Sequence, residues 1–141
     1  MPAATLEPGL THTFTYPVPP ERTVPHLYPE APEFAPMPAV FATGYLVGLV
    51  EWACVQLLRP HLDWPTEQTV GTHIDLSHDA PTPPGLAVTV RVELTRVDGR
   101  RLTFNFTAHD DLDAIATGSH QRAIIDTQRF SARAASKAHH R

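Results

Sequence analysis

Cysteine is almost absent from the sequence, since Cys54 is the only one in 141 residues. A single thiol excludes a disulfide within the chain and a zinc site built from several cysteines. Cys54 has no suitably spaced partner, so we expect it to pack as a small apolar side chain rather than to act as a nucleophile. The sparing use of cysteine is consistent with a reducing, cytoplasmic setting.

A concentrated basic surface is also missing. The chain has 11 Lys and Arg against 15 Asp and Glu, its formal net charge is -4, and its basic residues are scattered apart from a loose group at 129–141. We therefore expect neither nucleic acid nor an anionic membrane as a partner. The first residues, MPAATLEPGLTHTF, have neither a basic start nor an apolar core, so we expect no secretory signal.

Two patterns that would indicate another class of protein are incomplete. Residues 39–58 approach the length of a membrane span, but Glu51 and Gln56 lie in the second half of this run, and the alternating segments that follow need a soluble core. The acidic residues within 110–113 lack the spacing and length of a calcium-binding loop, so we expect a solvated turn there. We predict no membrane insertion and no metal site.

One long apolar helix followed by strands is what the sequence does contain. The helix is expected from Thr43, a good N-cap residue, to about Arg59, where Pro60 stops it. Since hardly any of its side chains are polar, we expect it to be buried on nearly all sides. Alternating or apolar runs predict strands at 10–16, 69–78, 86–97, 101–109 and 114–125.

These elements predict an α+β fold in which an antiparallel sheet wraps one long buried helix. We expect one domain over 10–130, with flexible segments at 1–9 and 131–141. The Pro-rich segment 17–38 carries enough apolar side chains to form an ordered cover before the helix. A single sheet surrounds a helix only partly, so an apolar helix side or sheet edge would stay exposed, and we expect a homodimer.

Glu51 is the one carboxylate in the apolar helix. An ionised carboxylate buried without partners is strongly disfavoured, so Glu51 must be paired, protonated or placed beside a cavity. Strict alternation along 69–78 places His78 on the side that faces the helix and Gly71 on the opposite side. His78 is therefore either a core histidine bonded to a backbone carbonyl or the acid/base partner of Glu51. Alternation gives His78 these companions on its face: Val70, Thr72, Ile74 and Leu76.

Thr43 stands at the expected start of the helix, where a threonine is often only a cap. Helix N-termini also attract negative charge, because their free N–H groups point outward and the helix dipole adds to them. A thioester or ester oxygen that develops negative charge would be stabilised there, with the amide of Gly44 as a candidate donor. Thr43, Glu51 and His78 therefore form a candidate catalytic set.

Four stretches carry a family resemblance: TVPHLYPEAPEFAPMPAVFATGYLVGLVEWACV, GTHIDLSHDAPTPPGLAVTV, VDGRRLTFNFTAHD and GSHQRAII. Over residues 10–125 the chain resembles the fluoroacetyl-CoA thioesterase family of hot-dog-fold acyl-CoA hydrolases. The resemblance implies that Thr43, Glu51 and His78 are catalytic and that Gly71 is a site glycine. It also implies a homodimer, a CoA thioester as substrate, no metal, and no cofactor other than the coenzyme A within that substrate.

The predicted acyl pocket departs from the family at one position. The fluoroacetyl-specific pattern has two phenylalanines in the cover near the acyl group, and the corresponding residues here are Phe34 and Met37. We expect both, together with Val40, to contact the acyl group. Met is longer and more adaptable than an aromatic ring, so the range of accepted acyl groups is expected to be wider.

Hydrolysis of a short acyl-CoA to a carboxylate and free CoA is the expected reaction, with fluoroacetyl-CoA among the candidate substrates. The sequence leaves the nucleophile open between Thr43, Glu51 and water. Two rival functions of the same fold also stay open, an acyl-CoA hydratase or dehydratase and a non-catalytic protein that binds an acyl ligand. Arg122 shares a strand face with His120, and both are candidates either to contact a CoA phosphate or to serve a structural role.

Overall fold

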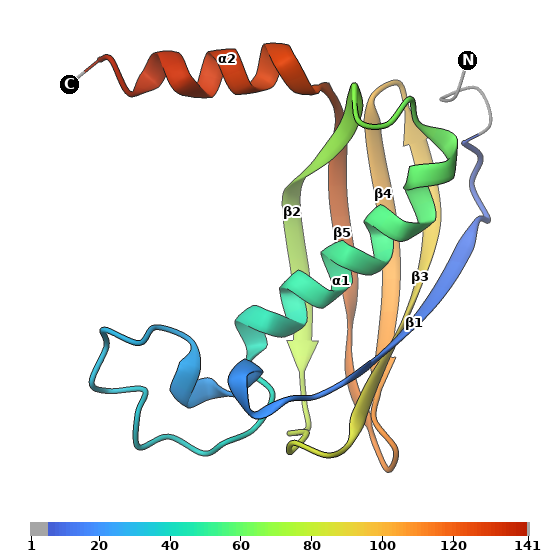
Figure 1. The fold of residues 1–141 in the computed structure, drawn as a ribbon. Coiled ribbons are helices and arrows are strands. Elements are labelled where there is room, and N and C mark those ends of the chain that lie inside the picture. The colour runs from blue at the N-terminus through green and yellow to red at the C-terminus, as the bar shows by residue number, and fades with distance from the viewer. Residues whose placement is uncertain (1–5, 141) are drawn as a thin grey trace.

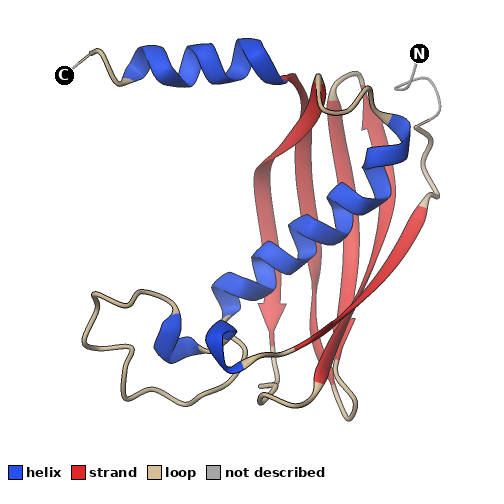
Figure 2. Cartoon of the chain, viewed as in Figure 1, coloured by secondary structure: helices blue, strands red, loops and turns tan. Residues whose placement is uncertain are grey.

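The computed structural model describes residues 6–140, which form a five-stranded antiparallel sheet with one long helix lying across it (Figure 1). Figure 2 shows a second helix, α2, extending from the end of the last strand. The elements are β1 (Thr11–Pro17), α1 (Thr43–Leu58), β2 (Glu67–His78), β3 (Ala87–Asp98), β4 (Arg101–His109), β5 (Ala114–Asp126) and α2 (Thr127–Lys137). The strand order is β1-β3-β4-β5-β2, so β1 and β2 are the sheet edges. The predicted α+β fold is confirmed.

The core lies between α1 and the inward side chains of the sheet. Val90, Val92 and Phe104 of the central strands are completely buried, and the helix contributes a row of buried side chains. This row consists of Leu46, Leu49, Val50, Ala53, Cys54, Leu57 and Leu58. Burial raises the pKa of the Cys54 thiol to about 12, so the thiolate is essentially absent at neutral pH. The prediction that Cys54 packs as an apolar side chain is confirmed.

One side of α1 is open. Gly44, Gly48 and Trp52 follow one another along this side, and Trp52 is 48% exposed. The expectation that the helix is buried on nearly all sides is therefore wrong for a single chain, because one sheet covers only part of a helix surface. The exposed apolar helix side that the sequence predicts is present. Among the described residues, no helix is long and apolar enough to cross a membrane.

A β-bulge in β2 changes which residues face the helix. Gly71 pairs with Arg122 on β5, whereas the next paired residue on β2 is His73, so Thr72 is an extra residue in the strand. An extra residue shifts the alternation of side chains by one. The expectation from strict alternation is therefore wrong before the bulge: Gly71, not Thr72, lies on the helix side with Ile74.

The two ends of the chain depart from the expected flexible segments. Leu6 is buried and the amide of Gly9 donates to the carbonyl of Leu94 at 2.8 Å, so residues 6–9 pack with the domain. The rest of the expected flexible N-terminus, residues 1–5, lies outside the described residues. Instead of a frayed tail past residue 130, α2 continues to Lys137 with all of its residues solvent-accessible. It projects from the body beyond the free β2 edge (Figure 1).

The segment expected to be a cover is ordered and packs on its own chain only at the start of α1, where Leu27 faces Gly44 and the carbonyl of His26 accepts from Tyr45. Thr23 forms a β-bridge with Phe41, and the rings of Tyr28 and Phe34 stack with centroids 6.2 Å apart. Beyond these contacts the segment forms a loop that projects past the N-terminal end of α1 (Figure 1). Its Tyr28 and Met37 side chains are 58% and 43% exposed. A surface on which these apolar side chains would pack is not supplied by the same chain.

The acidic residues of 110–113 form a turn, as expected. Asp110 accepts hydrogen bonds from the amides of Leu112 and Asp113 and from the hydroxyl of Thr82, each at 2.8 Å. These donors hold the pKa of Asp110 below its usual value, although burial alone would raise it. Within the described part of the chain, no group of three or more His, Cys, Asp or Glu residues is arranged to hold a metal ion.

Candidate active site

Thr43 and His78 form a direct pair where the start of α1 meets the end of β2. The Oγ1 atom of Thr43 lies 2.8 Å from Nδ1 of His78. The expectation that Thr43 caps the helix is wrong, because the N-cap is Ala42 and Thr43 is the first helical residue. The hydroxyl is therefore free of the capping bond and bonds to an imidazole nitrogen instead. A hydroxyl and an imidazole in this geometry are the components of an activated nucleophile or of a water-activating base.

A cavity of about 260 Å³ adjoins this pair. Its lining residues are Val24, Val40, Phe41, Thr43, His78, Asp79, Ala80 and Pro81. Val40 thus lies with the Thr43 and His78 pair, whereas Phe34 and Met37 are not among the lining residues. Gly44 faces the cover segment, because a Cβ at Gly44 would lie 3.2 Å from Cδ1 of Leu27. The cavity meets the first turn of α1, whose free N–H groups favour developing negative charge.

The environment of His78 favours the neutral imidazole. Burial lowers the pKa of His78, and the nearby charge of Asp79 opposes this only in part. Its Nε2 atom is buried and has no hydrogen-bond partner among the described residues. An unpaired buried nitrogen penalises the charged ring further. The burial of His78 thus favours the neutral imidazole, the protonation state that a general base needs.

Glu51 is paired, but its partner is Arg122 and not His78. Nη1 of Arg122 donates to Oε2 of Glu51 at 2.9 Å. Thr69 holds Arg122 through two hydrogen bonds, each 2.8 Å long. Nε of Arg122 donates to the hydroxyl of Thr69, and Nη2 donates to its backbone carbonyl. Arg122 is 5% exposed and the Glu51 side chain 40% exposed. Within one chain the expected Glu51 and His78 pair does not form.

His120 completes the surroundings of Glu51. Its Nδ1 lies 2.7 Å from the carbonyl of His73 and its Nε2 lies 3.1 Å from Nη1 of Arg122. Since a carbonyl only accepts and a guanidinium only donates, the ring proton is on Nδ1 and the ring is neutral. Burial lowers the pKa of His120, which agrees with this assignment. His120 and Arg122 are buried and directed at Glu51, which argues against contact with a CoA phosphate.

Gly71 makes room for the Glu51 carboxylate. A Cβ at Gly71 would lie 2.5 Å from Oε2 of Glu51 and 3.2 Å from Cε1 of His120. A second cavity, of about 330 Å³, opens in front of this carboxylate. It is lined by Val47, Glu51, Gly71, Thr72, His73, Ile74 and His120. The carboxylate is thus both paired and beside a cavity, two of the three outcomes expected from the sequence.

The candidate residues therefore form two clusters in one chain. Thr43, His78 and Val40 lie at the N-terminal end of α1, whereas Glu51, Gly71 and Arg122 lie further along it. Thr43 and Glu51 are eight positions apart, which corresponds to about 12 Å of helix. Sequence reasoning missed the part played by Thr69 as the anchor of Arg122, for which no sequence signal exists. For the position of His120 beside Glu51 the sequence offers one weak indication: His120 is two residues from Arg122 on the same strand, so the two side chains share a face.

A five-stranded antiparallel sheet wrapped around one long helix, with Thr–His and Glu–Arg pairs beside cavities along that helix, defines a hot-dog-fold thioesterase. The chain belongs to the fluoroacetyl-CoA-specific thioesterase family, whose model matches residues 20–128. It is 54% identical over 127 residues to the fluoroacetyl-CoA thioesterase of Streptantibioticus cattleyicolor, an alignment that covers 90% of this chain and 89% of that one.

Solved structures agree with this assignment. A structure of the fluoroacetyl-CoA thioesterase FlK is 51% identical to this chain and superposes with a TM-score of 0.91, covering 94% of this chain and 97% of the other. A thioesterase superfamily member from Thermus thermophilus is 25% identical with a TM-score of 0.83, and the match covers 95% and 94% of the two chains. A hot-dog-like protein from Thermanaerovibrio acidaminovorans, at 21% identity and a TM-score of 0.78, shares the fold.

Proposed function

We propose that the protein hydrolyses a short acyl-CoA thioester, with fluoroacetyl-CoA as the first candidate, to a carboxylate and free CoA. The observation that carries this proposal is the 2.8 Å contact between Oγ1 of Thr43 and Nδ1 of His78 at the N-terminus of α1, beside a cavity. The acyl group is suggested by the relatives, which are named as fluoroacetyl-CoA thioesterases.

In the proposed reaction the thioester carbonyl lies against the first turn of α1. The free N–H groups of that turn stabilise the oxyanion as the nucleophile adds to the carbonyl carbon. When Thr43 or water is the nucleophile, neutral His78 accepts its proton through Nδ1, the C–S bond breaks, and the proton passes to the departing CoA thiolate. When the Glu51 carboxylate is the nucleophile it has no proton to give, and the CoA thiolate leaves as the C–S bond breaks. In both covalent routes a water molecule then hydrolyses the acyl-enzyme or anhydride, which releases the carboxylate and restores the side chain. Three routes stay open: an acyl-enzyme on Thr43, an anhydride on Glu51, and direct attack by water.

A complete site needs Thr43 and Glu51 together, and a second copy of the chain supplies this. The distance of about 12 Å between them along α1 is too long for both to act on one carbonyl. The β2 edge is unpaired, and both the cover loop and α2 project beyond it (Figure 1). In a two-fold homodimer formed on this side, Thr43 of one protomer lies beside Glu51 of its partner, which gives two identical composite sites.

The same arrangement accounts for the exposed cover. Phe34 and Met37 do not line the cavity of their own Thr43, but in the proposed dimer the loop that carries them lies over the partner. We assign them to the acyl pocket there, where Arg122 holds the Glu51 carboxylate and Gly71 leaves room for it. Met37 at the second position predicts an acyl range wider than that of a pocket with two phenylalanines.

The test is release of free thiol from acetyl, fluoroacetyl, chloroacetyl, propionyl and longer acyl-CoA esters. Hydrolysis of short esters, with the carboxylate identified as the product, supports the proposal. Hydration of an enoyl-CoA without thiol release would instead indicate a hydratase, and binding without turnover an acyl-carrying protein. Unchanged rates in the presence of a metal chelator would support the predicted independence of metal ions. A cytoplasmic location stays a prediction from the sequence.

A further inference from the structure

A protein that acts on CoA thioesters meets a substrate with a large anionic end, the phosphorylated adenosine of coenzyme A. The residues around Glu51 are not available to bind this anionic end of the substrate. Arg122 is 5% exposed and most of its donors are occupied by Thr69, Glu51 and His120. The phosphates must therefore lie against another part of the surface.

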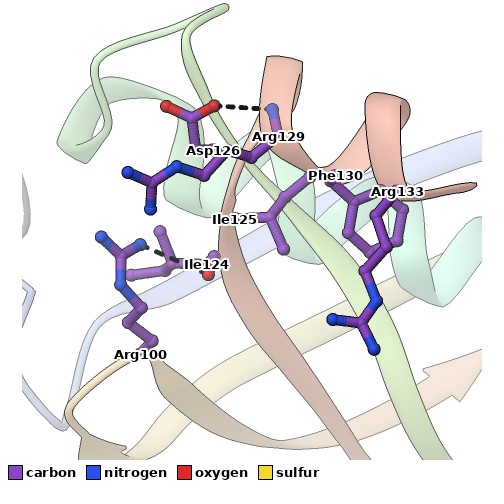
Figure 3. Close-up of a pocket in the computed structure, with 7 residues that line it drawn as sticks. All are labelled: Arg100, Ile124, Ile125, Asp126, Arg129, Phe130 and Arg133. Atoms are coloured by element: carbon purple, nitrogen blue, oxygen red, sulfur yellow. Dashed lines mark hydrogen bonds between the residues drawn. The ribbon is translucent and has the colours of Figure 1, made fainter.

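An arginine-lined cavity of about 330 Å³ lies between α2 and the end of the sheet (Figure 3). Its lining residues are Arg100, Ile124, Ile125, Asp126, Arg129, Phe130 and Arg133. Arg100 comes from the turn between β3 and β4, and Arg129 and Arg133 are one helical turn apart on α2. Figure 3 shows the guanidinium groups of Arg100 and Arg129 pointing toward one another.

The charges in this cavity are not balanced. In the part of the chain that the structure describes, none of the three arginines has an ion pair with a carboxylate. Asp126 is the one acid in the lining, and its carboxylate accepts a hydrogen bond from the backbone amide of Arg129 at 2.9 Å. The guanidinium groups of Arg100 and Arg129 point toward one another with no carboxylate between them, whereas that of Arg133 points away beside Phe130 (Figure 3). The first two therefore repel one another, and a phosphate relieves that repulsion through charge-assisted hydrogen bonds.

Phe130 adds an aromatic surface to the same cavity and is 45% exposed. Arginines beside an exposed ring match a nucleotide, whose base stacks on aromatic side chains while its phosphates pair with arginine. Arg122 and Asp126 are four positions apart on β5, which corresponds to about 13 Å. The pantetheine arm of CoA bridges such a gap between a thioester at Glu51 and a nucleotide at α2.

We propose that Arg100, Arg129, Arg133 and Phe130 form the subsite for the phosphorylated adenosine of the CoA substrate. This proposal rests on the proposed thioesterase function, whose substrate class it specifies further. The other arginine-rich cavity is a weaker candidate. It is smaller, at about 160 Å³, it has no aromatic residue, and its Arg96 is 3.8 Å from the carboxylate of Asp98.

The experiment compares two substrates that carry the same acyl group, the CoA thioester and the truncated N-acetylcysteamine thioester. The variants are Arg100→Ala and the double variant Arg129→Ala with Arg133→Ala. We expect KM for the CoA thioester to rise about tenfold or more while kcat stays near wild type, because uniform binding is lost. Kinetics with the truncated substrate should not change. Arg91→Ala on β3 and Lys137→Ala on α2 are matched controls, since each removes one exposed positive charge outside the cavity lining.

A second measurement separates this proposal from the proposed function. Adenosine 3′,5′-bisphosphate is titrated into wild type and variants by calorimetry, without any acyl group. If wild type hydrolyses no thioester but binds the bisphosphate more tightly than the arginine variants do, the thioesterase function fails and the nucleotide subsite stands. If hydrolysis is normal and the variants bind the bisphosphate and the CoA thioester like wild type, the subsite is refuted. Equal KM increases for both substrates would also refute it. No residue of α2 is buried within its own chain, so the double variant should keep that chain's fold even if Arg100→Ala does not, and size-exclusion chromatography checks that it keeps the wild-type oligomeric state.

Discussion

Gly71 and Glu51 are so close that a methyl group on Gly71 would lie 2.5 Å from Oε2 of the carboxylate. Carbon and oxygen atoms without a bond between them do not approach to this distance, so only glycine permits the observed position of Glu51. The bulge at Thr72 is what turns Gly71 toward α1. The bulge in β2 therefore makes the observed position of the Glu51 carboxylate on α1 possible.

The first prediction is that Gly71→Ala lowers kcat by about 100-fold, because an added Cβ displaces the carboxylate by about an ångström or more. The fold should persist, since the side chains in conflict belong to the site. The informative control is the double variant with Glu51→Gln. If Gly71 acts through the carboxylate, Gly71→Ala should cost nothing further once Glu51→Gln is present, and an additive loss would assign Gly71 a separate role.

Glu51→Gln is expected to fold normally and to lose about 10²–10⁴-fold in turnover, because it keeps the shape and removes the negative charge. The variant retains an amide oxygen that accepts from Arg122, so its melting temperature should stay close to wild type. Steady-state kinetics and thermal melting measure the two effects. Hydrolysis at the wild-type rate would end the assignment of Glu51 as a catalytic residue.

Much of this architecture follows from the sequence, because it depends on local patterns. Each predicted strand begins and ends within two residues of the observed one, since hydrophobic alternation and turn residues act over short range. The orientation of Gly71 did not follow, because a bulge depends on register with a distant strand. The partner of Glu51 did not follow either: Arg122 is 71 residues away in sequence, and only the sheet brings it to the helix.

Stability is expected to fall as the pH is lowered below about 6.5, the ordinary pKa of histidine. Burial lowers the pKa of both His78 and His120 in the folded protein. The unfolded chain therefore binds protons more readily than the folded one in this range, and protonation favours unfolding. Asp110 contributes only at much lower pH, since its pKa lies below the usual value of 3.8. Urea unfolding between pH 7.5 and 5 measures the slope, and His120→Gln should reduce it. If the free energy of unfolding of His120→Gln falls with pH as steeply as that of wild type, the lowered pKa of His120 in the folded protein is contradicted.

Met37→Phe should narrow the range of accepted acyl groups. A rigid ring removes volume that the flexible Met side chain can yield, so activity on propionyl and longer esters should fall about tenfold relative to the fluoroacetyl ester. The ratios of kcat/KM across the panel of esters measure this selectivity. Met37→Leu, which stays aliphatic, is the control and should keep the wild-type profile. An unchanged profile in Met37→Phe would place this residue away from the acyl pocket.

The composite site makes the most direct prediction. Thr43→Ala and Glu51→Ala chains, each inactive alone, are mixed under conditions that permit subunit exchange. A mixed dimer contains one doubly altered site and one intact site, built from Thr43 of one chain and Glu51 of the other. Random pairing makes about half of the dimers mixed, so up to about a quarter of wild-type activity should return.

Each cluster holds only part of the proposed catalytic set, which explains why the mixture should be active and neither parent variant should be. The hydroxyl of Thr43 is bonded to the His78 imidazole, whereas Glu51 lies with Arg122 and His120 in the other cluster of the same chain. A control mixture of Thr43→Ala with His78→Ala should remain inactive, because both residues belong to the same half of a site in the same chain. Exchange is verified by mass spectrometry of the intact dimers. Verified exchange without recovered activity would mean that Thr43 and Glu51 do not share a site across two chains.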